Sequence, residues 1–192
     1  MRDELKKLVS ESRVPDAGDF SDTLWIAKNF HSGRLELALK HQREAEKELK
    51  TEEELWIVAD DIHFYAAQEV GLVWHFCLWR LQAILEGIIT GRFLYSRGVT
   101  KRLPGLKAKL DALHEAGYTI DAADYSELLE WAKVRNQLSH FPPPSYGFGP
   151  LEYADVEEYY RVCIRFCDNL REQMEIATDT NLRVPLGESD AP

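Results

Sequence analysis

The stretch "VGLVWHFCLWRLQAILEGII", residues 70–89, is apolar on nearly every side of a helix. A helix with one apolar stripe faces one core, whereas a helix that is apolar all round is buried on more than one side. In a chain of 192 residues, the second side is covered either by neighbouring helices of the same protein or by another subunit. The stretch therefore predicts a bundle built around one central helix.

The central helix is predicted to span about residues 52–95. In "TEEEL", Thr51 is an N-cap and three glutamates follow at the positive end of the helix dipole. The first half carries one apolar stripe, formed by Leu55, Val58, Ile62 and Tyr65. Three glycines in the second half favour either a kink or close packing: Gly71, Gly87 and Gly91.

The flanking segments also have helical periodicity. Residues 24–49 form one helix face with Leu24, Ala27, Leu35, Ala38, Ala45 and Leu49, and Ser21 and Asp22 are the predicted N-cap. A short helix with Leu106, Leu110 and Leu113 on one face stops at Gly117. Another follows from residue 119 until Pro142, and the last covers residues 153–177. The predicted class is all-α, an up-and-down helical bundle of four to six helices.

Length and composition favour a single domain over residues 1–177, in which about residues 1–50 are an N-terminal elaboration or the first bundle helix. The polar tail, residues 178–192, is expected to be disordered. Hydrophobic residues make up 45% and charged residues 29%, which is typical of a globular protein. We find no apolar run long enough to cross a bilayer, and the N-terminus is too charged for a signal peptide, so we expect a cytoplasmic protein without a membrane partner.

The net charge of -10 excludes a globally basic nucleic-acid binder, although a local basic patch remains compatible with it. The cysteines are Cys77, Cys163 and Cys167. An odd count without a C-x-x-C pair argues against a disulfide framework and against a zinc site. We expect the three thiols to be buried, and we predict neither a metal nor a cofactor.

A second informative stretch is "EWAKVRNQLSHFPPP", residues 130–144. Asn136 and His140 are four residues apart and share a helix face, and Arg135 lies beside them. The helix C-terminus stabilises an imidazolium at His140, and an Arg fork matches phosphate. A proton shuttle and a cation are the groups needed to cleave a phosphodiester without metal. The alternative is that Arg135 pairs with an acidic residue and His140 only caps the helix.

The motif "RNQLSH", in a late helix of an all-α bundle that ends at a proline turn, resembles the HEPN superfamily, many of whose members carry Arg, four to six residues, and His. The resemblance covers roughly residues 52–177. It implies a metal-independent endoribonuclease, often a toxin or antiviral defence effector, with Arg135, Asn136 and His140 as catalytic residues. It also implies a homodimer with a composite site, RNA as substrate, and an antitoxin or defence-complex partner.

Two points qualify the resemblance. Where some HEPN toxins have a Tyr that a nucleotidyltransferase modifies, this chain has Pro142. Other HEPN proteins are catalytically silent, so the alternative function is a non-catalytic dimeric scaffold or binding module in a larger complex. For a homodimer, we predict an interface in the central helix formed by Leu72, Trp74, Cys77, Leu78 and Leu81.

Residues 87–110 contain basic residues and no acidic one. We predict that RNA phosphates contact Arg92, Arg97, Lys101 and Arg102, with Lys107 and Lys109 nearby. The alternative is an ordinary solvated surface, on which Phe93 and Tyr95 pack rather than stack on bases.

One rival class is a metal oxidase or hydrolase. Asp60 with His63, and Asp111 with His114, have the carboxylate-x-x-His spacing of di-metal bundles. Core positions Ile62 and Leu113 turn these residues away from the bundle interior, which argues against a di-metal site. The isolated histidines His31, His41 and His75 are predicted surface or interface residues.

Overall fold

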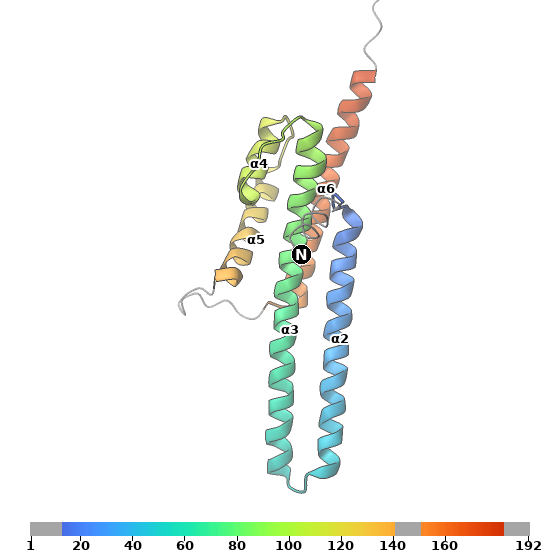
Figure 1. Ribbon diagram of the computed structural model, residues 1–192, viewed down its shortest axis with the longest axis vertical. Helices are drawn as coiled ribbons and strands as arrows, with labels where there is room; N and C mark the ends of the chain where they lie inside the picture. The colour runs from blue at the N-terminus through green and yellow to red at the C-terminus, as the bar shows by residue number, and fades with distance from the viewer. Residues whose placement is uncertain (1–12, 141–150, 183–192) are drawn as a thin grey trace, which may run out of the picture.

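The computed structural model describes residues 13–140 and 151–182, apart from the side chains of His140 and of residues 177–182. The elements are α2 (Ala17–Glu48), α3 (Glu52–Ile88), the π-helix η1 (Ile89–Leu94), α4 (Gly105–Glu115), α5 (Ala122–His140) and α6 (Tyr153–Leu182). The described residues contain no strand, so the predicted all-α, up-and-down bundle is confirmed (Figure 1). Helix α6 continues past residue 177, where its end was predicted.

Helix α2 begins earlier than the sequence suggested. Asp16 is its N-cap: the Asp16 carboxylate accepts from the Gly18 amide at 2.8 Å, and the Asp19 carboxylate accepts from the Asp16 amide at 2.8 Å. This reciprocal capping satisfies the amides of Asp16 and Gly18, which have no helical carbonyl four residues earlier to bond to. The helix therefore begins here and not at Ser21. The N-cap predicted for α3 is confirmed, because Thr51 Oγ1 accepts from the Glu54 amide at 3.2 Å.

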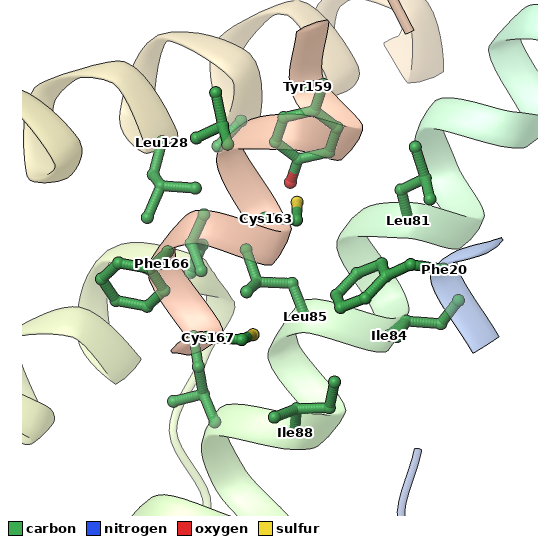
Figure 2. Close-up of a cluster of buried hydrophobic side chains, with 14 of the residues drawn as sticks. Phe20, Leu81, Ile84, Leu85, Ile88, Leu128, Tyr159, Cys163, Phe166 and Cys167 are labelled. Carbon is green, nitrogen blue, oxygen red and sulfur yellow. The ribbon is translucent and has the colours of Figure 1, made fainter. Parts of the chain in front are cut away.

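Helix α3 is the central element, and α2, α4, α5 and α6 pack around its second half (Figure 1). The first half of α3 and the second half of α2 extend beyond the other helices as a two-helix arm. The core contains Leu81 and Leu85 of α3 against Tyr159 and Phe166 of α6 (Figure 2). Of the described helices, several therefore bury the second half of α3, whereas α2 alone runs along its first half.

Most residues of the predicted apolar helix faces are buried, but some are exposed. Leu24, Ala27 and Ala38 are buried as expected, but Leu35 is exposed. On α3, Tyr65 is exposed and Ala66 is buried in its place, because a helix of 3.6 residues per turn drifts away from a strictly heptad stripe.

The three cysteines are free and buried, as predicted. Burial raises the pKa of Cys77 and of Cys167 to about 12. Both thiols are therefore protonated and unreactive at neutral pH.

Helix α3 with η1 is long and apolar enough to cross a bilayer by length and composition alone, contrary to the expectation from the sequence. Half of its most apolar window is buried inside the bundle. A core helix passes the same test, so this observation does not distinguish a membrane span from a core helix.

Two of the three glycines in α3 and η1 allow close packing. A Cβ at Gly87 would lie 2.9 Å from Cγ of Pro15, and one at Gly91 would lie 2.8 Å from Cγ1 of Val14. The segment before α2 therefore crosses the junction of α3 and η1 at a distance that only glycine permits.

We predict that Gly91→Ala lowers the free energy of unfolding by about 1–3 kcal/mol, because the new methyl group displaces Val14. Gly71→Ala is the matched control, since a Cβ there meets nothing within 4 Å, and alanine favours the helix by up to about 1 kcal/mol. Urea unfolding of both variants measures the difference. Equal stability of the two variants would contradict the close packing.

Candidate functional site

The candidate site is the C-terminal end of α5, where the Arg135 guanidinium lies over the Trp79 ring of α3. The distance from Cζ to the ring centroid is 5.2 Å. Arg135 Nη1 also donates to Asn136 Oδ1 at 3.0 Å. A cation over an indole face is held in orientation without being neutralised. The structure thus brings two of the predicted catalytic residues together and adds Trp79, which the sequence analysis had not identified.

Arg135 keeps donors available for a ligand. Among the described side chains, it pairs with no carboxylate, and its buried Nε has no hydrogen-bond partner. Buried donors without a partner are rare in native proteins and call for an explanation. Because this Nε has no accessible surface, a phosphate or carboxylate would bind the Nη donors of the guanidinium instead.

Contacts with α6 hold helix α5 in place near its start and near its middle. Near its start, the buried Asp124 carboxylate accepts from Arg165 Nη2 at 2.7 Å. Near its middle, the Trp131 ring lies 5.2 Å from the Tyr159 ring of α6. One turn beyond Arg135, Ser139 Oγ donates to the Arg135 carbonyl at 2.9 Å. Arg135 therefore stands on a helix that its neighbours hold in place.

His140 is the last residue of α5, so its backbone carries the negative end of the helix dipole. The alternative that Arg135 is merely ion-paired finds no support among the described side chains. The His140 side chain, the motif's Phe141 and the proline turn at Pro142 lie outside the described part of the chain.

The predicted RNA-binding residues lie at another end of the protein. Arg92, Lys101 and Arg102 are exposed and form no ion pair with the described residues, while Arg97 lies over the Tyr118 ring at 5.1 Å. Their segment follows α3 at the end of the bundle opposite the arm, whereas α5 runs back towards the arm (Figure 1). Within one protomer, the structure does not bring these residues next to Arg135.

The neighbouring basic and aromatic side chains are already engaged. Lys109 pairs with Glu86 at 2.6 Å and Lys107 with Asp111 at 2.7 Å. Phe93 is buried, whereas Tyr95 is exposed. Within residues 87–110, the basic side chains without an ion pair among the described residues are therefore those of residues 92–102.

The predicted dimer interface is wrong in four of its five residues. Trp74, Cys77, Leu78 and Leu81 are buried in the core of one protomer and cannot meet a second copy. Leu72 is 57% exposed. The other apolar side of α3 points outward, and it carries Phe76, which is 70% exposed, and Trp79.

We call this exposed surface the apolar face. It consists of Leu72, Phe76 and Trp79 of α3 with Ile26 and Phe30 of α2, all of them exposed. Ile26, Phe30 and Phe76 line one shallow groove of about 340 Å³, and the Phe76 and Trp79 rings lie 6.4 Å apart. The apolar face is therefore continuous across both helices, and its α5 edge is Trp79, on which Arg135 stacks.

The residues of the rival metal sites have other partners. His63 Nε2 hydrogen-bonds with Gln42 Oε1 at 2.9 Å. Asp111 accepts from Tyr125 and from Lys107, each at 2.7 Å. No group of three or more metal-binding side chains occurs in the described ranges. Comparison with family models, with curated proteins and with solved structures finds no match to this chain.

We predict that Trp79→Ala loosens the Arg135 guanidinium, whereas Trp79→Phe, which retains an aromatic face, does so less. The order parameter of the Arg135 Nε–H group, measured by ¹⁵N relaxation, should fall in the alanine variant and stay closer to wild type in the phenylalanine variant. An unchanged order parameter in both variants would show that Trp79 does not hold Arg135.

Proposed function

We propose that this protein is a metal-independent endoribonuclease whose site combines the α5 ends of two copies. The observation that carries the proposal is Arg135, a cation that pairs with no carboxylate of the described residues and stacks on the edge of an exposed apolar face. A cation beside an imidazole suits phosphodiester cleavage. The resemblance of "RNQLSH" to the HEPN motif supports the same function and favours a toxin or defence effector.

Each residue of the motif has a role in this proposal. Arg135 neutralises the charge that develops on the non-bridging phosphoryl oxygens, and Asn136, which already accepts from Arg135, orients it or the substrate. His140, at the helix end that stabilises an imidazolium, transfers a proton. The attack of the adjacent 2′-hydroxyl would leave a 2′,3′-cyclic phosphate.

A second copy fits the apolar face because the spacing on α3 is self-complementary. Leu72, Phe76, Trp79 and Ala83 are exposed and follow the alternating four- and three-residue steps of a coiled-coil seam, and the exposed Tyr65 lies one heptad before Leu72, with Glu69 at the seam position between them. In an antiparallel pair, Leu72 of one copy lies opposite Phe76 of the other, and Tyr65 lies opposite Ala83. Both pairings are centred at the level of Trp74, where a two-fold axis would cross α3.

The exposed residues of helix α2 are also related by a two-fold axis at this level. Its contacts with α3 pair Thr23 with Cys77 above the level of Trp74, and Arg34 with Glu69 below it. The level of Trp74 therefore crosses α2 between Ile26 and Phe30. The same rotation that pairs Leu72 with Phe76 brings Ile26 of one copy opposite Phe30 of the other.

The end of α5 lies at this level too. Helix α5 runs antiparallel to α3 (Figure 1), and Arg135 lies over Trp79. His140 is five residues beyond Arg135, a rise of about 7.5 Å, which equals the rise from Trp79 back to Trp74. The two-fold axis therefore passes beside the ends of both α5 helices, so the second copy completes the site.

Charge favours the antiparallel arrangement. Between Thr51 and Trp79, α3 carries Glu and Asp but neither Lys nor Arg. A parallel pair would align these acidic halves, and like charges in contact are unfavourable. An antiparallel pair separates them. The exposed Arg92, Arg97, Lys101 and Arg102 then lie towards the outer ends of the dimer, where they can attract RNA phosphates.

A partner protein also has a surface on which to bind. The arm exposes Trp56, Ile57 and Phe64 outside the apolar face, and exposed aromatic residues of this kind are frequent at protein interfaces. An antitoxin or a defence-complex subunit would dock there without entering the site.

The assembly is tested by Phe76→Asp. We predict that it converts a dimer into a folded monomer, because Phe76 is exposed in the protomer and buried between copies. Leu78→Asp is the matched contrast, since Leu78 is fully buried in the protomer and a charge there should unfold it. Light scattering and circular dichroism measure both properties. A monomeric wild type at micromolar concentration would reject the dimer.

The activity is tested by incubating the wild type with total RNA and a chelator. We predict cleavage to 2′,3′-cyclic phosphate ends, and a loss on the order of 10²-fold or more in His140→Ala. Arg135→Lys should also be inactive, because a lysine cannot reproduce the fork of the guanidinium. Lys133→Gln is the control, since Lys133 is an exposed α5 cation paired with Glu130.

Both inactive variants should remain folded dimers, because Arg135 is not a core residue and His140 is the last residue of α5. Absence of cleavage by the wild type, or full cleavage by dimeric His140→Ala, would reject the catalytic proposal. The protein would then be better described as a dimeric scaffold.

A further inference from the structure

The groove between α2 and α3 is filled by α6 in the bundle, and the described residues leave it uncovered along the arm. Helix α6 begins at Tyr153, midway along α3, and from there on it packs against both α2 and α3 (Figure 1). Before this level, α2 and α3 lie side by side as far as the tip of the arm. We call the uncovered part the arm groove, and it is lined by His31 and Leu35 of α2 and by His63, Ala67, Val70 and Gly71 of α3.

The arm groove deepens into a cavity where α6 begins. The cavity has a volume of about 520 Å³, and the residues at the start of α6 close one end of it. This end is aromatic: the Trp74 ring lies 5.3 Å from the His31 ring and 5.5 Å from the Tyr153 ring. A concave site of this size, with apolar walls and a few polar groups, is typical of a binding site. The cavity has room for an apolar side chain of a partner.

Contacts between α2 and α3 keep the arm groove in shape. His63 Nε2 of α3 hydrogen-bonds with Gln42 Oε1 of α2 at 2.9 Å. Along the arm, the small residues Ala38 of α2 and Ala66 of α3 are buried. Two helices in contact present a groove into which the side chains of a third helix pack. Because α6 occupies this groove in the bundle, a second helix in line with α6 can occupy its continuation.

The charge beside the arm groove favours a basic partner. Glu152 lines the cavity, and Asp60 lies one turn from His63 towards the tip of the arm. Neither carboxylate has an ion pair among the described residues. Helix α3 carries neither Lys nor Arg between Thr51 and Trp79, so it does not neutralise them. Such a surface repels RNA and attracts a protein segment that carries Lys or Arg.

We infer that the arm groove binds an amphipathic helix of a partner protein, with an apolar side chain in the cavity and basic side chains beside Asp60 and Glu152. Trp56 is 70% exposed and lies one heptad before His63, so it extends the groove towards the tip. From Trp74 to Trp56 the groove is about 27 Å long, which accommodates about 18 residues of helix.

The arm groove shares no residue with the apolar face. A second copy on the apolar face and a partner helix in the arm groove can therefore be bound at the same time. The inference defines the chemistry of the partner and does not depend on the proposed ribonuclease activity.

The first test measures the binding of model helices to the full-length protein. The probe is a fluorescent peptide of about 18 residues, composed of Leu and Lys in the order of an amphipathic helix. Its counterpart has Glu in place of every Lys. In fluorescence anisotropy, we expect the Leu–Lys peptide to bind at least about tenfold more tightly than the Leu–Glu peptide, because like charges repel. Equal binding of the two peptides would contradict the charge complementarity.

The second test locates the bound peptide. Gly71→Leu places a side chain in the cavity, and the fold tolerates it because a Cβ at Gly71 meets nothing within 4 Å. We expect it to weaken binding of the Leu–Lys peptide on the order of tenfold, as loss of a central interface contact does. Gly33→Leu is the matched control, since a Cβ at Gly33 also meets nothing within 4 Å but Gly33 lines a separate groove with Phe30. It should bind the peptide like the wild type.

The charge is tested in the same way. Asp60→Lys should weaken binding of the Leu–Lys peptide more than Glu36→Lys, because Glu36 is exposed on α2 and does not line the cavity. An equal effect of the two substitutions would show that only the net charge of the protein attracts the peptide, and the inference would be wrong.

Three further outcomes would overturn the inference. Equal binding by Gly71→Leu and Gly33→Leu would show that the peptide lies elsewhere. A lower mass of Gly71→Leu than of the wild type in light scattering would show that a second copy fills the arm groove. Absence of binding by the wild type, with binding by a variant in which a Gly-Ser linker replaces residues 141–150, would show that this segment fills it. None of these measurements involves RNA cleavage, so the proposed function is tested separately.

Discussion

The structure depends on one constraint: α3 is apolar on nearly every side, and a bundle of this size covers only one of them. Leu78, Leu81 and Leu85 are buried in the core, while Leu72 and Phe76 are exposed to water. Exposing a large apolar side chain that could be buried forgoes about 1.5–3 kcal/mol. Continuous faces of this kind mark interaction surfaces. The face lies on α2 and α3, the two helices that form the arm, and Arg135 stacks on Trp79 at its edge.

Arg135 joins this face to the candidate site. Its guanidinium stacks on Trp79, which is both the edge of the apolar face and a wall of the candidate site. An arginine held by an indole keeps its full charge, whereas an arginine held by a carboxylate would be largely neutralised for a phosphate. If a second copy covers Trp79, water leaves the surroundings of Arg135 and its attraction for a phosphoryl group strengthens. Assembly and activity would then be coupled through one aromatic ring.

The sequence predicted the helices well because their signals are local: Thr51 caps α3, Gly117 follows α4, and Leu106, Leu110 and Leu113 form one buried face. It misplaced the start of α2, since Asp16 and Ser21 are both good caps and only the contacts of Asp16 decide between them. It also chose the wrong side of α3, because a helix that is apolar all round does not reveal which side its neighbours cover. The spacing of Leu72, Phe76, Trp79 and Ala83 was a usable signal. The stacking of Arg135 on Trp79 was not predictable, since it joins helices distant in sequence.

The central claim is that two copies meet through α3 in antiparallel orientation, with the axis at the level of Trp74. The most direct test is a distance between spin labels attached at Glu53→Cys, near the exposed tip of the arm. The two labels lie on opposite sides of the axis, and the rise of the helix predicts a separation of about 63 Å between them. A separation of about 30 Å or less would indicate parallel arms, and the absence of any coupling between copies would indicate a monomer. Either result would contradict a composite site at the ends of α5.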